Sequence, residues 1–252
     1  MKFDNSELIG LIPAAGKGTR LSLPFPKELY PIIQDNKYRP VSQSILEQIV
    51  YAGVDHVVFV VNEHKSQLLQ YFGNGHRFNC NVSYVVQEQP KQTSERAITP
   101  GLAEAMDAGY HLVKDKIVVF GMPDTIITPK HIFKTALANL RNDYDGIFCL
   151  FKAEKPEKSG MVILSDEDEV LEIVDKPQKT DLEWMWGTVI WKPTFNSFLH
   201  DCITNRGVYE YGVIFNEALK SGLKFGGVKF DEGKYLDLGT VDDVVRVKES
   251  AN

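Results

Sequence analysis

Along the first part of the chain, short apolar runs alternate with segments in which apolar residues recur at helical spacing. Gly, Pro or Asn bound the apolar runs, which predicts buried strands. The predicted strands are Leu8–Pro13, His56–Val61, Val82–Gln87, Lys116–Gly121 and Gly146–Lys152. The helical patterns between them cover Val41–Ala52, Ser66–Phe72, Gly101–Val113 and Pro129–Leu140. This alternation favours a mostly parallel sheet with helices on both faces.

After about Ala153 the pattern changes. The segment SGMVILSDEDEVLEIVDKP alternates apolar and polar residues around an acidic turn, which predicts an antiparallel hairpin. The later predicted elements are a strand at Trp184–Trp191, helices at Pro193–Ile203 and Val208–Ser221, a strand at Phe225–Phe230 and a helix at Val241–Lys248. No repeat, low-complexity tract or linker interrupts them. We expect one domain over residues 1–252, with a first part of about 1–150 and a smaller part of about 151–235.

Three tryptophans lie in the predicted strand Trp184–Trp191. Alternate residues of a strand share a face, so Trp184 and Trp186 are expected to point the same way. Large aromatic side chains usually serve burial, so core packing is the favoured role. The alternative is that they form a wall of a ligand pocket.

The charge of the chain narrows the classes of partner. The formal net charge is −6, and no extended run of Lys or Arg is present. A nucleic-acid or anionic-membrane binder needs a basic surface, so neither partner is expected. A small anionic ligand bound by a local group of cations remains compatible with this charge.

Cysteine usage indicates a reducing compartment. The three cysteines, Cys80, Cys149 and Cys202, are widely spaced and match neither a disulfide framework nor a zinc motif. The N-terminal segment lacks the apolar core of a signal peptide, and no apolar run approaches the length of a membrane span. We therefore expect a cytoplasmic protein.

A glycine-rich segment, AAGKGTR, follows the first predicted strand and is itself followed by PKEL. It is not a P-loop, because Gly18 rather than Ser or Thr follows Lys17, and not a dinucleotide fingerprint, because residue 21 is Leu. Glycines let backbone N–H groups approach phosphate oxygens closely. Arg20 can grip two oxygens through its planar fork, whereas Lys27 is a compact point charge. The loop alone is equally compatible with a solvated turn.

Four further segments, together with this loop, resemble the sugar-phosphate nucleotidyltransferases in the order that family has them. They are VVFGMPDTII, SGMV, VDKP and YLDLGT. The resemblance covers nearly the whole chain and implies a Rossmann-like three-layer α/β/α fold of the GT-A type. Its mixed, mostly parallel sheet would carry a small antiparallel region. Residues 1–150 would then bind the nucleotide, and residues 151–235 the sugar phosphate.

The resemblance also implies roles for individual residues. The nucleotide-binding set would be Ala14, Ala15, Gly16, Lys17, Gly18, Thr19, Arg20, Gln87 and Gly101, with Gln89 competing for the place of Gln87. The sugar-phosphate set would be Gly160, Asp175, Lys176 and Gly187. Arg20, Lys27 and Lys176 would be catalytic. Asp124 and Asp237 would bind Mg²⁺, which prefers one or two carboxylates and keeps its other positions for water and phosphate.

Each aspartate has a structural alternative. Asp124 lies in MPDT, which is good turn chemistry. Asp237 precedes a helix that Thr240 would cap, with Asp243 completing a capping box. Because both aspartates lie in the context that the family pattern requires, metal binding is the favoured interpretation.

The chain departs from the family pattern at three points. The spacing from Arg20 to Lys27 is short and resembles the methylerythritol-phosphate and alditol-phosphate cytidylyltransferases. Asp175 stands where the family has Glu, and Pro123 replaces the glycine before the metal-binding Asp. These changes leave phosphate chemistry in place but bear on the base and on the acceptor.

Three functions follow as hypotheses. The first is a magnesium-dependent enzyme that joins a nucleoside triphosphate, dTTP or UTP, to a sugar 1-phosphate. The second is a cytidylyltransferase acting on an alditol phosphate or another small phosphorylated alcohol. The third is a non-catalytic nucleotide-binding regulator. A monomer or small homo-oligomer is expected for all three.

Overall fold

The computed structural model describes residues 3–18, 21, 23–34, 36–88, 101–240 and 243. In this part of the chain, nine strands form one large sheet. They are β1 (Leu8–Pro13), β4 (His56–Val61), β5 (Asn81–Val86), β6 (Ile117–Phe120), β8 (Gly146–Lys152), β9 (Gly160–Leu164), β10 (Val170–Asp175), β11 (Trp184–Trp191) and β12 (Phe225–Lys229). Each predicted strand is therefore present, with bounds that differ by at most a residue at either end.

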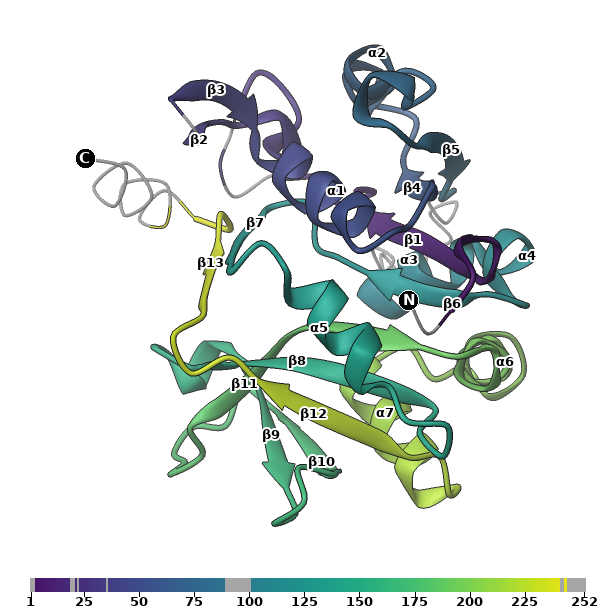
Figure 1. Cartoon of the computed structure of the whole chain (residues 1–252), viewed down its shortest axis with the longest axis vertical. Helices are drawn as coiled ribbons and strands as arrows, with labels where there is room; N and C mark the ends of the chain where they lie inside the picture. The colour runs from purple at the N-terminus through teal and green to yellow at the C-terminus, as the bar shows by residue number, and fades with distance from the viewer. Residues whose placement is uncertain are drawn as a thin grey trace, which may run out of the picture.

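The sheet is mixed but mostly parallel, as the sequence predicts. Strand β1 lies between β4 and β6 and runs parallel to both, and β5 is parallel to β4. Strand β11 then runs antiparallel to β6, β8 and β9, and β12 is parallel to β8. The predicted hairpin is the antiparallel pair β9 and β10. The sheet continues through both predicted parts of the chain (Figure 1).

Helices cover both faces of this sheet, and strands β1, β4, β6 and β8 are accordingly buried on both sides. Side chains of α1 (Val41–Tyr51), α2 (Ser66–Phe72) and α5 (Ile132–Asn139) pack in one core with Leu8 and Ile12. Side chains of α3 (Leu102–Ala108), α4 (Tyr110–Val113), α6 (Pro193–Asp201) and α7 (Tyr211–Lys220) pack in the other core with Ile9 and Leu11. The result is the predicted three-layer arrangement.

Helix α1 packs especially close to the sheet. A methyl group built at Gly121, directly after β6, would lie 2.4 Å from Cγ1 of Ile45 on α1. Only glycine allows this approach, and it fixes the segment that leads from β6 to Asp124 against α1.

Some helix bounds differ from those predicted. The single helix predicted at Gly101–Val113 is wrong, because the chain breaks at Gly109 into α3 and α4; glycine is a poor helix former. Helix α5 begins at Ile132, after Pro129. Helix α6 ends at Asp201 and continues as a π turn, Cys202–Arg206, and α7 begins only at Tyr211. The predicted helix Val241–Lys248 lies outside the described residues, apart from Asp243.

Two small sheets and several short turns were not predicted from the sequence. Strand β2 (Pro31–Gln34) pairs with β3 (Lys37–Pro40), and β7 (Thr125–Thr128) pairs with β13 (Lys234–Asp237). The 3-10 turns are Asn5–Glu7, Lys27–Leu29, His76–Phe78 and Pro156–Lys158. A small third core made by Ile32, Val41 and Leu238 joins the two sheets to α1.

The tryptophan strand packs as expected. Trp184 and Trp186 lie toward the same core, while Met185 packs against the other. A bulge at Gly187 shifts the alternation by one residue, so Trp191 also enters the core of Trp186. Trp186 and Trp191 are buried, and Trp184 is half-buried beneath Lys152 and Lys229.

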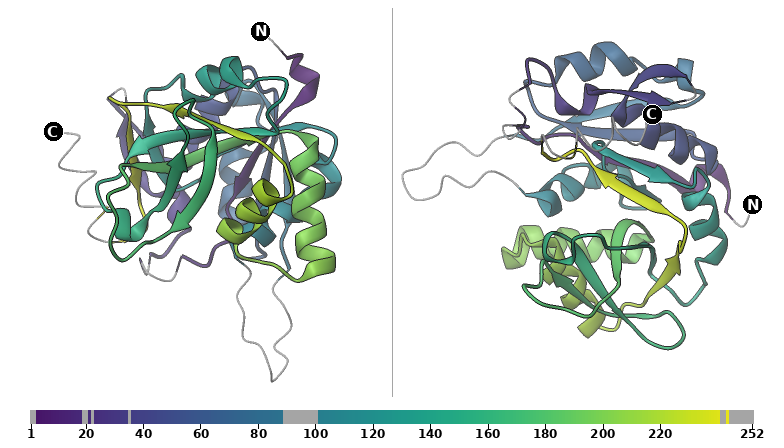
Figure 2. Two further views of the ribbon diagram at one scale, coloured as in Figure 1. Left: turned by 90° about the horizontal axis from the view of Figure 1, so that it is seen from below. Right: turned by 90° about the vertical axis from the view of Figure 1, so that its left-hand side faces the viewer.

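The two halves of the molecule are joined by the pairing of β6 with β11 and a second time by the C-terminal strand. Strands β1, β4 and β5 with α1 and α2 make one half, and strands β8 to β12 with α6 and α7 make the other (Figures 1 and 2). The chain after β12 returns from the second half to pair β13 with β7, near α1. This return brings residues near position 237 beside residues near position 124.

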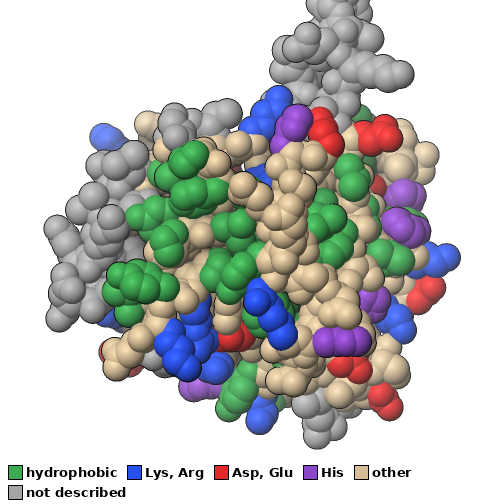
Figure 3. Space-filling model, turned by 90° about the horizontal axis from the view of Figure 1, so that it is seen from above, with side chains coloured by type: hydrophobic (Ala, Val, Ile, Leu, Met, Phe, Trp, Pro, Cys, Tyr) green, Lys and Arg blue, Asp and Glu red, His purple; other side chains and the backbone are tan. Residues whose placement is uncertain are grey.

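On the face seen in Figure 3, Lys and Arg side chains occur in small groups among apolar and other residues. No helix in the described ranges combines the length and apolarity that crossing a membrane requires.

Candidate active site

The glycine-rich turn begins where β1 ends, at the carboxyl edge of the parallel strands. The backbone N–H of Ala14 donates to the carbonyl of Val60 over 2.6 Å, and the side-chain amide of Asn62 donates to the carbonyl of Ala15 over 2.6 Å. Gly16 and Lys17 are exposed, and Gly18 has a φ of +66°, a backbone conformation that favours glycine. The start of the turn is thus anchored, and Gly16 and Lys17 after it are open to solvent. Thr19 and Arg20 lie outside the described residues.

Lys27 lies against this turn. A methyl group at Gly18 would be 3.6 Å from Cγ of Lys27, and Nζ of Lys27 forms an ion pair with Oδ2 of Asp124. Burial lowers the pKa of Lys27, but the carboxylates of Asp124, Glu28 and Asp237 together outweigh it, Asp124 most of all, and the net direction is upward. Lys27 therefore carries its positive charge at neutral pH.

Asp124 is a buried carboxylate that is only half satisfied. The residue is 4% exposed and follows β6 through the tightly packed Gly121. Lys27 takes its Oδ2, whereas its buried Oδ1 has no hydrogen-bond partner among the described residues. A buried acceptor without a partner is costly, unless a ligand completes it.

Asp237 lies beside Asp124, although the two are far apart in sequence. It pairs with Thr125 in the β7–β13 ladder, and the N–H of the next residue, Leu238, donates to the carbonyl of Asp124 over 2.8 Å. Leu236 and Leu238 belong to the small third core. Because side chains alternate along a strand, Asp237 projects to the other side, where its charge helps to raise the pKa of Lys27.

The residues present fit a Mg²⁺ ion. Asp124 offers a free buried carboxylate oxygen, and Asp237 offers a second, exposed carboxylate on the neighbouring strand. Two carboxylates suit magnesium, which retains water and phosphate ligands. No group of three or more His, Cys, Asp and Glu side chains arranged for metal binding occurs in the described part of the chain.

The helix-capping alternative for the segment after Asp237 is also present. Thr240 Oγ1 and Asp243 Oδ2 are 2.6 Å apart, and the backbone N–H groups of Thr240 and Asp243 donate to each other's side chains. The capping box is formed by Thr240 and Asp243, so it does not occupy Asp237.

The residues predicted to hold the sugar phosphate gather around an aromatic pair. Tyr211 on α7 donates its hydroxyl to Asp175 over 2.9 Å and packs edge-on against Trp186, with ring centroids 5.3 Å apart. Gly160 lies against the indole of Trp186, where a methyl group would be 2.3 Å from Nε1. That indole N–H is buried without a partner among the described residues. Lys176 is mostly exposed, with Nζ 3.4 Å from Asp175.

Tyr235 connects this region to the two aspartates. A methyl group at Gly187 would be 2.5 Å from its Cδ2. Burial raises the pKa of Tyr235, and the nearby Asp237, Asp124 and Tyr211 raise it further. Sequence analysis missed Tyr235 and Tyr211. For Tyr235 a signal was available, since it precedes Asp237 by two positions in a strand and so shares its face.

The predicted base-binding residues Gln87 and Gly101 lie directly after β5 and directly before α3. The backbone N–H of Gln87 donates to the carbonyl of Val61 over 2.8 Å, and its buried Nε2 has no partner in the described ranges. The N–H of Gly101 donates to Oε2 of Glu104 over 2.6 Å at the start of α3. Gln89 lies outside the described residues. A buried amide N–H that lacks a partner among the described residues could donate to a base edge.

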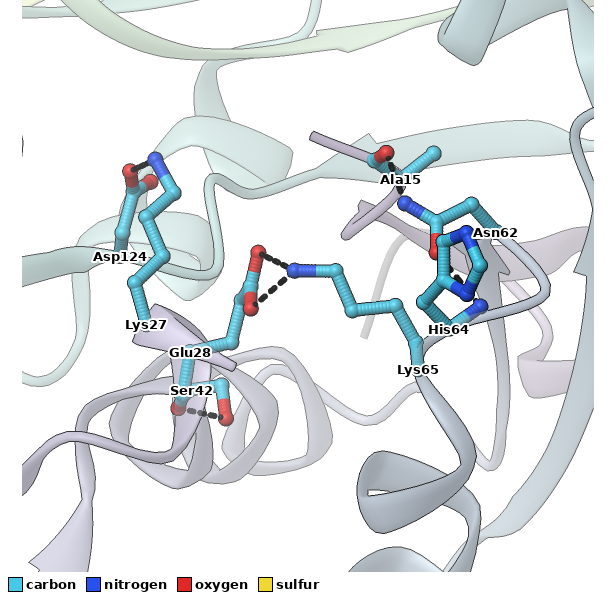
Figure 4. A network of polar contacts seen from close by, with 8 residues as sticks. All are labelled: Ala15, Lys27, Glu28, Ser42, Asn62, His64, Lys65 and Asp124. Carbon is cyan, nitrogen blue, oxygen red and sulfur yellow. Dashed lines mark hydrogen bonds and ion pairs between the residues drawn. The ribbon is translucent and has the colours of Figure 1, made fainter. Parts of the chain in front are cut away.

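A network of polar contacts connects the glycine-rich turn with the turn that carries Lys27 (Figure 4). Glu28 follows Lys27 and accepts from Nζ of Lys65 at 2.9 and 2.7 Å. Ser42 on α1 donates to the carbonyl of Glu28 over 2.6 Å. Glu28 was visible in PKEL, but nothing in the sequence marks Lys65 as buried.

Comparison with known sequences gives the family. The family model described as nucleotidyl transferase matches residues 9–252. UTP–glucose-1-phosphate uridylyltransferase AglF of Haloferax volcanii is 25% identical over 246 residues, which cover 92% of each chain. Glucose-1-phosphate thymidylyltransferase of Neisseria meningitidis is 25% identical over 69% of this chain and 58% of its own length. With the bifunctional protein GlmU of Methanococcus maripaludis, a 26% identical match covers 68% of this chain but 36% of that protein.

Solved structures agree on the fold. A Bacillus anthracis protein crystallised with sucrose superimposes with a TM-score of 0.80, covering 97% of this chain and 95% of that one at 20% identity. A UDP-glucose pyrophosphorylase crystallised with UDP-glucose gives a TM-score of 0.77, with coverage of 96% and 97% at 22% identity. The predicted Rossmann-like fold of the GT-A type is confirmed. The chain thus belongs to the nucleotidyl transferase family, among the sugar-phosphate nucleotidyltransferases.

Proposed function

We propose that this protein is a magnesium-dependent nucleotidyltransferase. It joins a nucleoside triphosphate, dTTP or UTP, to a sugar 1-phosphate, giving a nucleoside-diphosphate sugar and pyrophosphate. Relatives named for glucose-1-phosphate with UTP or dTTP support this substrate class. The observation that carries the proposal is the buried Asp124, which shares one oxygen with Lys27, keeps the other free and adjoins Asp237.

The barrier to this reaction is the repulsion of two anions and the negative charge that develops on the transferred group. In the proposal, backbone N–H groups of Gly16 to Gly18 bind the triphosphate. Lys27, charged at neutral pH, neutralises it from the adjacent position. Arg20 is assigned to the reacting phosphoryl group, and Lys176 to the incoming sugar phosphate.

The acceptor lies, in this proposal, between Gly160, Asp175 and Gly187. Tyr211 fixes the Asp175 carboxylate, which can then accept from a sugar hydroxyl. Trp186 and Tyr235 form apolar walls beside these groups. Asp124 and Asp237 would hold Mg²⁺, which would supply positive charge to offset the negative charge of the triphosphate. Gln87 contacts the base.

The test is a matrix of five nucleoside triphosphates (ATP, GTP, CTP, UTP and dTTP) against common sugar phosphates, with pyrophosphate release as the readout. We expect release only when a triphosphate, a sugar 1-phosphate and Mg²⁺ are all present, with dTTP or UTP preferred. The absence of release across the whole matrix would contradict the proposal.

Two other outcomes would identify the alternatives. Preference for CTP with an alditol phosphate would support the cytidylyltransferase that the short spacing from Arg20 to Lys27 suggests. Tight triphosphate binding without pyrophosphate release would indicate a non-catalytic regulator. A cytoplasmic location and a monomer or small homo-oligomer remain predictions.

A further inference from the structure

A buried ion pair lies next to the proposed site but belongs to none of its ligand sets. Glu28 is 1% exposed and Lys65 is 4% exposed, and the ammonium of Lys65 contacts both carboxylate oxygens of Glu28. Burial raises the pKa of Glu28, and Lys65 opposes this rise. A buried ion pair gives little net stability compared with apolar residues of similar volume. Stability alone therefore does not account for it.

The Glu28 end of the pair fixes the turn that carries Lys27. The two residues are consecutive in the 3-10 turn Lys27–Leu29. Ser42 holds the backbone carbonyl of Glu28 from α1, while Lys65 holds its carboxylate from the opposite side. Both the backbone and the side chain of Glu28 are therefore held in place. This fixes the backbone of the neighbouring Lys27, whose side chain reaches Asp124.

Lys65 lies three residues after Asn62, whose side chain holds the start of the glycine-rich turn. Lys65 donates its backbone N–H to the carbonyl of Asn62 over 3.1 Å, and Asn62 holds the carbonyl of Ala15. The Asn62 side chain is itself oriented by the backbone N–H of His64, 2.9 Å away. Figure 4 shows that this short segment reaches both sides of the site. It therefore sets the spacing between the phosphate turn and Lys27.

Direct contact of Lys65 with substrate does not fit the geometry. Its Nζ lies 2.9 and 2.7 Å from the oxygens of Glu28, and almost none of the residue is exposed. To reach a phosphate it would have to leave Glu28 as an unpaired buried charge, which is strongly unfavourable.

We propose that Glu28 and Lys65 are positioning residues, which set Lys27 relative to Gly16–Gly18 for phosphoryl-group chemistry without touching the substrate. The proposal rests on the proposed function for the identity of that chemistry. A misplacement of about 1 Å in such a site costs on the order of 100-fold in rate. A displaced Lys27 still carries its charge beside the triphosphate, whereas its alignment in the transition state is lost, so the effect falls mainly on turnover.

The decisive variant is the double substitution Glu28→Met and Lys65→Met, which replaces the pair by apolar side chains. Lys65→Met alone leaves a buried charge and should destabilise the fold, whereas the double variant should recover most of that loss. The double variant should nevertheless show kcat lowered by about 10- to 100-fold. The KM for the triphosphate should change by less than about threefold.

A control removes the ion pair of Arg206 and Asp201, 2.6 Å apart, which lies at the end of α6 in the other half of the molecule. Replacing both of its members by Met is expected to alter stability but not kcat. Wild-type kcat in the folded Glu28→Met, Lys65→Met variant would overturn the proposal.

Should the double variant not fold, Glu28→Gln provides the same test with nearly unchanged shape. It removes the charge and one of the two oxygens that hold Lys65, so kcat should fall by at least about threefold. An unchanged kcat would overturn the proposal.

A crystal structure of the double variant separates this inference from the proposed function. The proposal expects the Lys27–Asp124 ion pair to be broken or displaced, and its retention would overturn the proposal whatever the turnover. Lack of pyrophosphate release by the wild-type protein would instead contradict the proposed function alone.

Discussion

At the scale of single residues, the site is defined by polar atoms that lack partners. Asp124 Oδ1, Gln87 Nε2 and Trp186 Nε1 are buried without hydrogen bonds among the described residues. They belong to the regions assigned to metal, base and sugar. Native proteins satisfy most buried polar groups. Gln34 Oε1, Ser44 Oγ and Gln48 Oε1 are also buried without a partner in the described ranges, so such an atom supports ligand binding only together with the family motif that contains it.

The charge on Lys27 gives a pH prediction. Burial lowers its pKa, but Asp124, Glu28 and Asp237 together outweigh burial and the net shift is upward. Lys27 therefore contributes stability that is present below its unfolded pKa of about 10.4. That contribution is lost as pH rises through the higher folded pKa. Asp124 is the largest of the causes that raise the pKa of Lys27. The substitution Asp124→Asn should therefore abolish the stability that the charge of Lys27 contributes.

The measurement is the free energy of unfolding of both proteins between neutral and strongly alkaline pH. The wild-type protein should lose more stability than Asp124→Asn as the pH passes through the alkaline range. Because the other Lys and Tyr residues titrate in both proteins, only the difference between the two curves is compared. Parallel curves would argue against the electrostatic coupling of Lys27 to Asp124.

At the scale of elements, two glycines beside the sheet have opposite roles. A methyl group at Gly16 has no heavy atom within 4 Å, whereas one at Gly121 meets Ile45 at 2.4 Å. Gly16 thus leaves space for a ligand, and Gly121 leaves space for a helix. Substitutions at Gly16 and at Gly121 can therefore be compared to separate an effect on ligand binding from an effect on folding.

We expect Gly16→Ala to change the free energy of unfolding by less than about 0.5 kcal/mol. Its methyl group should nevertheless obstruct the approach of phosphate oxygens to the turn and weaken triphosphate binding at least tenfold. Gly121→Ala should cost about 1–3 kcal/mol of stability through overpacking against α1. Denaturant unfolding and calorimetric titration of the triphosphate give both quantities.

The added substitution Ile45→Ala should restore part of the stability lost in Gly121→Ala, because it removes the atoms that clash. Unchanged triphosphate affinity in Gly16→Ala would contradict the phosphate role of the turn.

At the scale of the whole molecule, the sequence predicts the large sheet well and the small ones poorly. The runs Leu8–Pro13 and Gly146–Lys152 are buried on both faces, so their apolar character is continuous and their bounds are clear. Strands β7 and β13 have four residues each and pair only with one another, which leaves little periodicity to detect. Yet this pairing brings Asp237 to Asp124.

The candidate site was predicted only in part for the same reason. The family resemblance nominates Asp124, Asp237 and Lys27 one by one, but their proximity depends on a contact between distant segments of the chain. Lys65 and Tyr211 carry no local signal, because their burial depends on Glu28 and on Trp186 and Asp175. Tertiary structure alone identifies them.

The most direct measurement is a crystal structure with Mn²⁺, in place of Mg²⁺, and a non-hydrolysable triphosphate. We expect an anomalous peak for manganese in contact with Oδ1 of Asp124 and with the carboxylate of Asp237, and the triphosphate on the backbone of Gly16–Gly18 with Lys27 beside it. The peak should be absent from Asp124→Asn. Manganese bound elsewhere, with the two aspartates unliganded and the triphosphate away from the turn, would contradict the account.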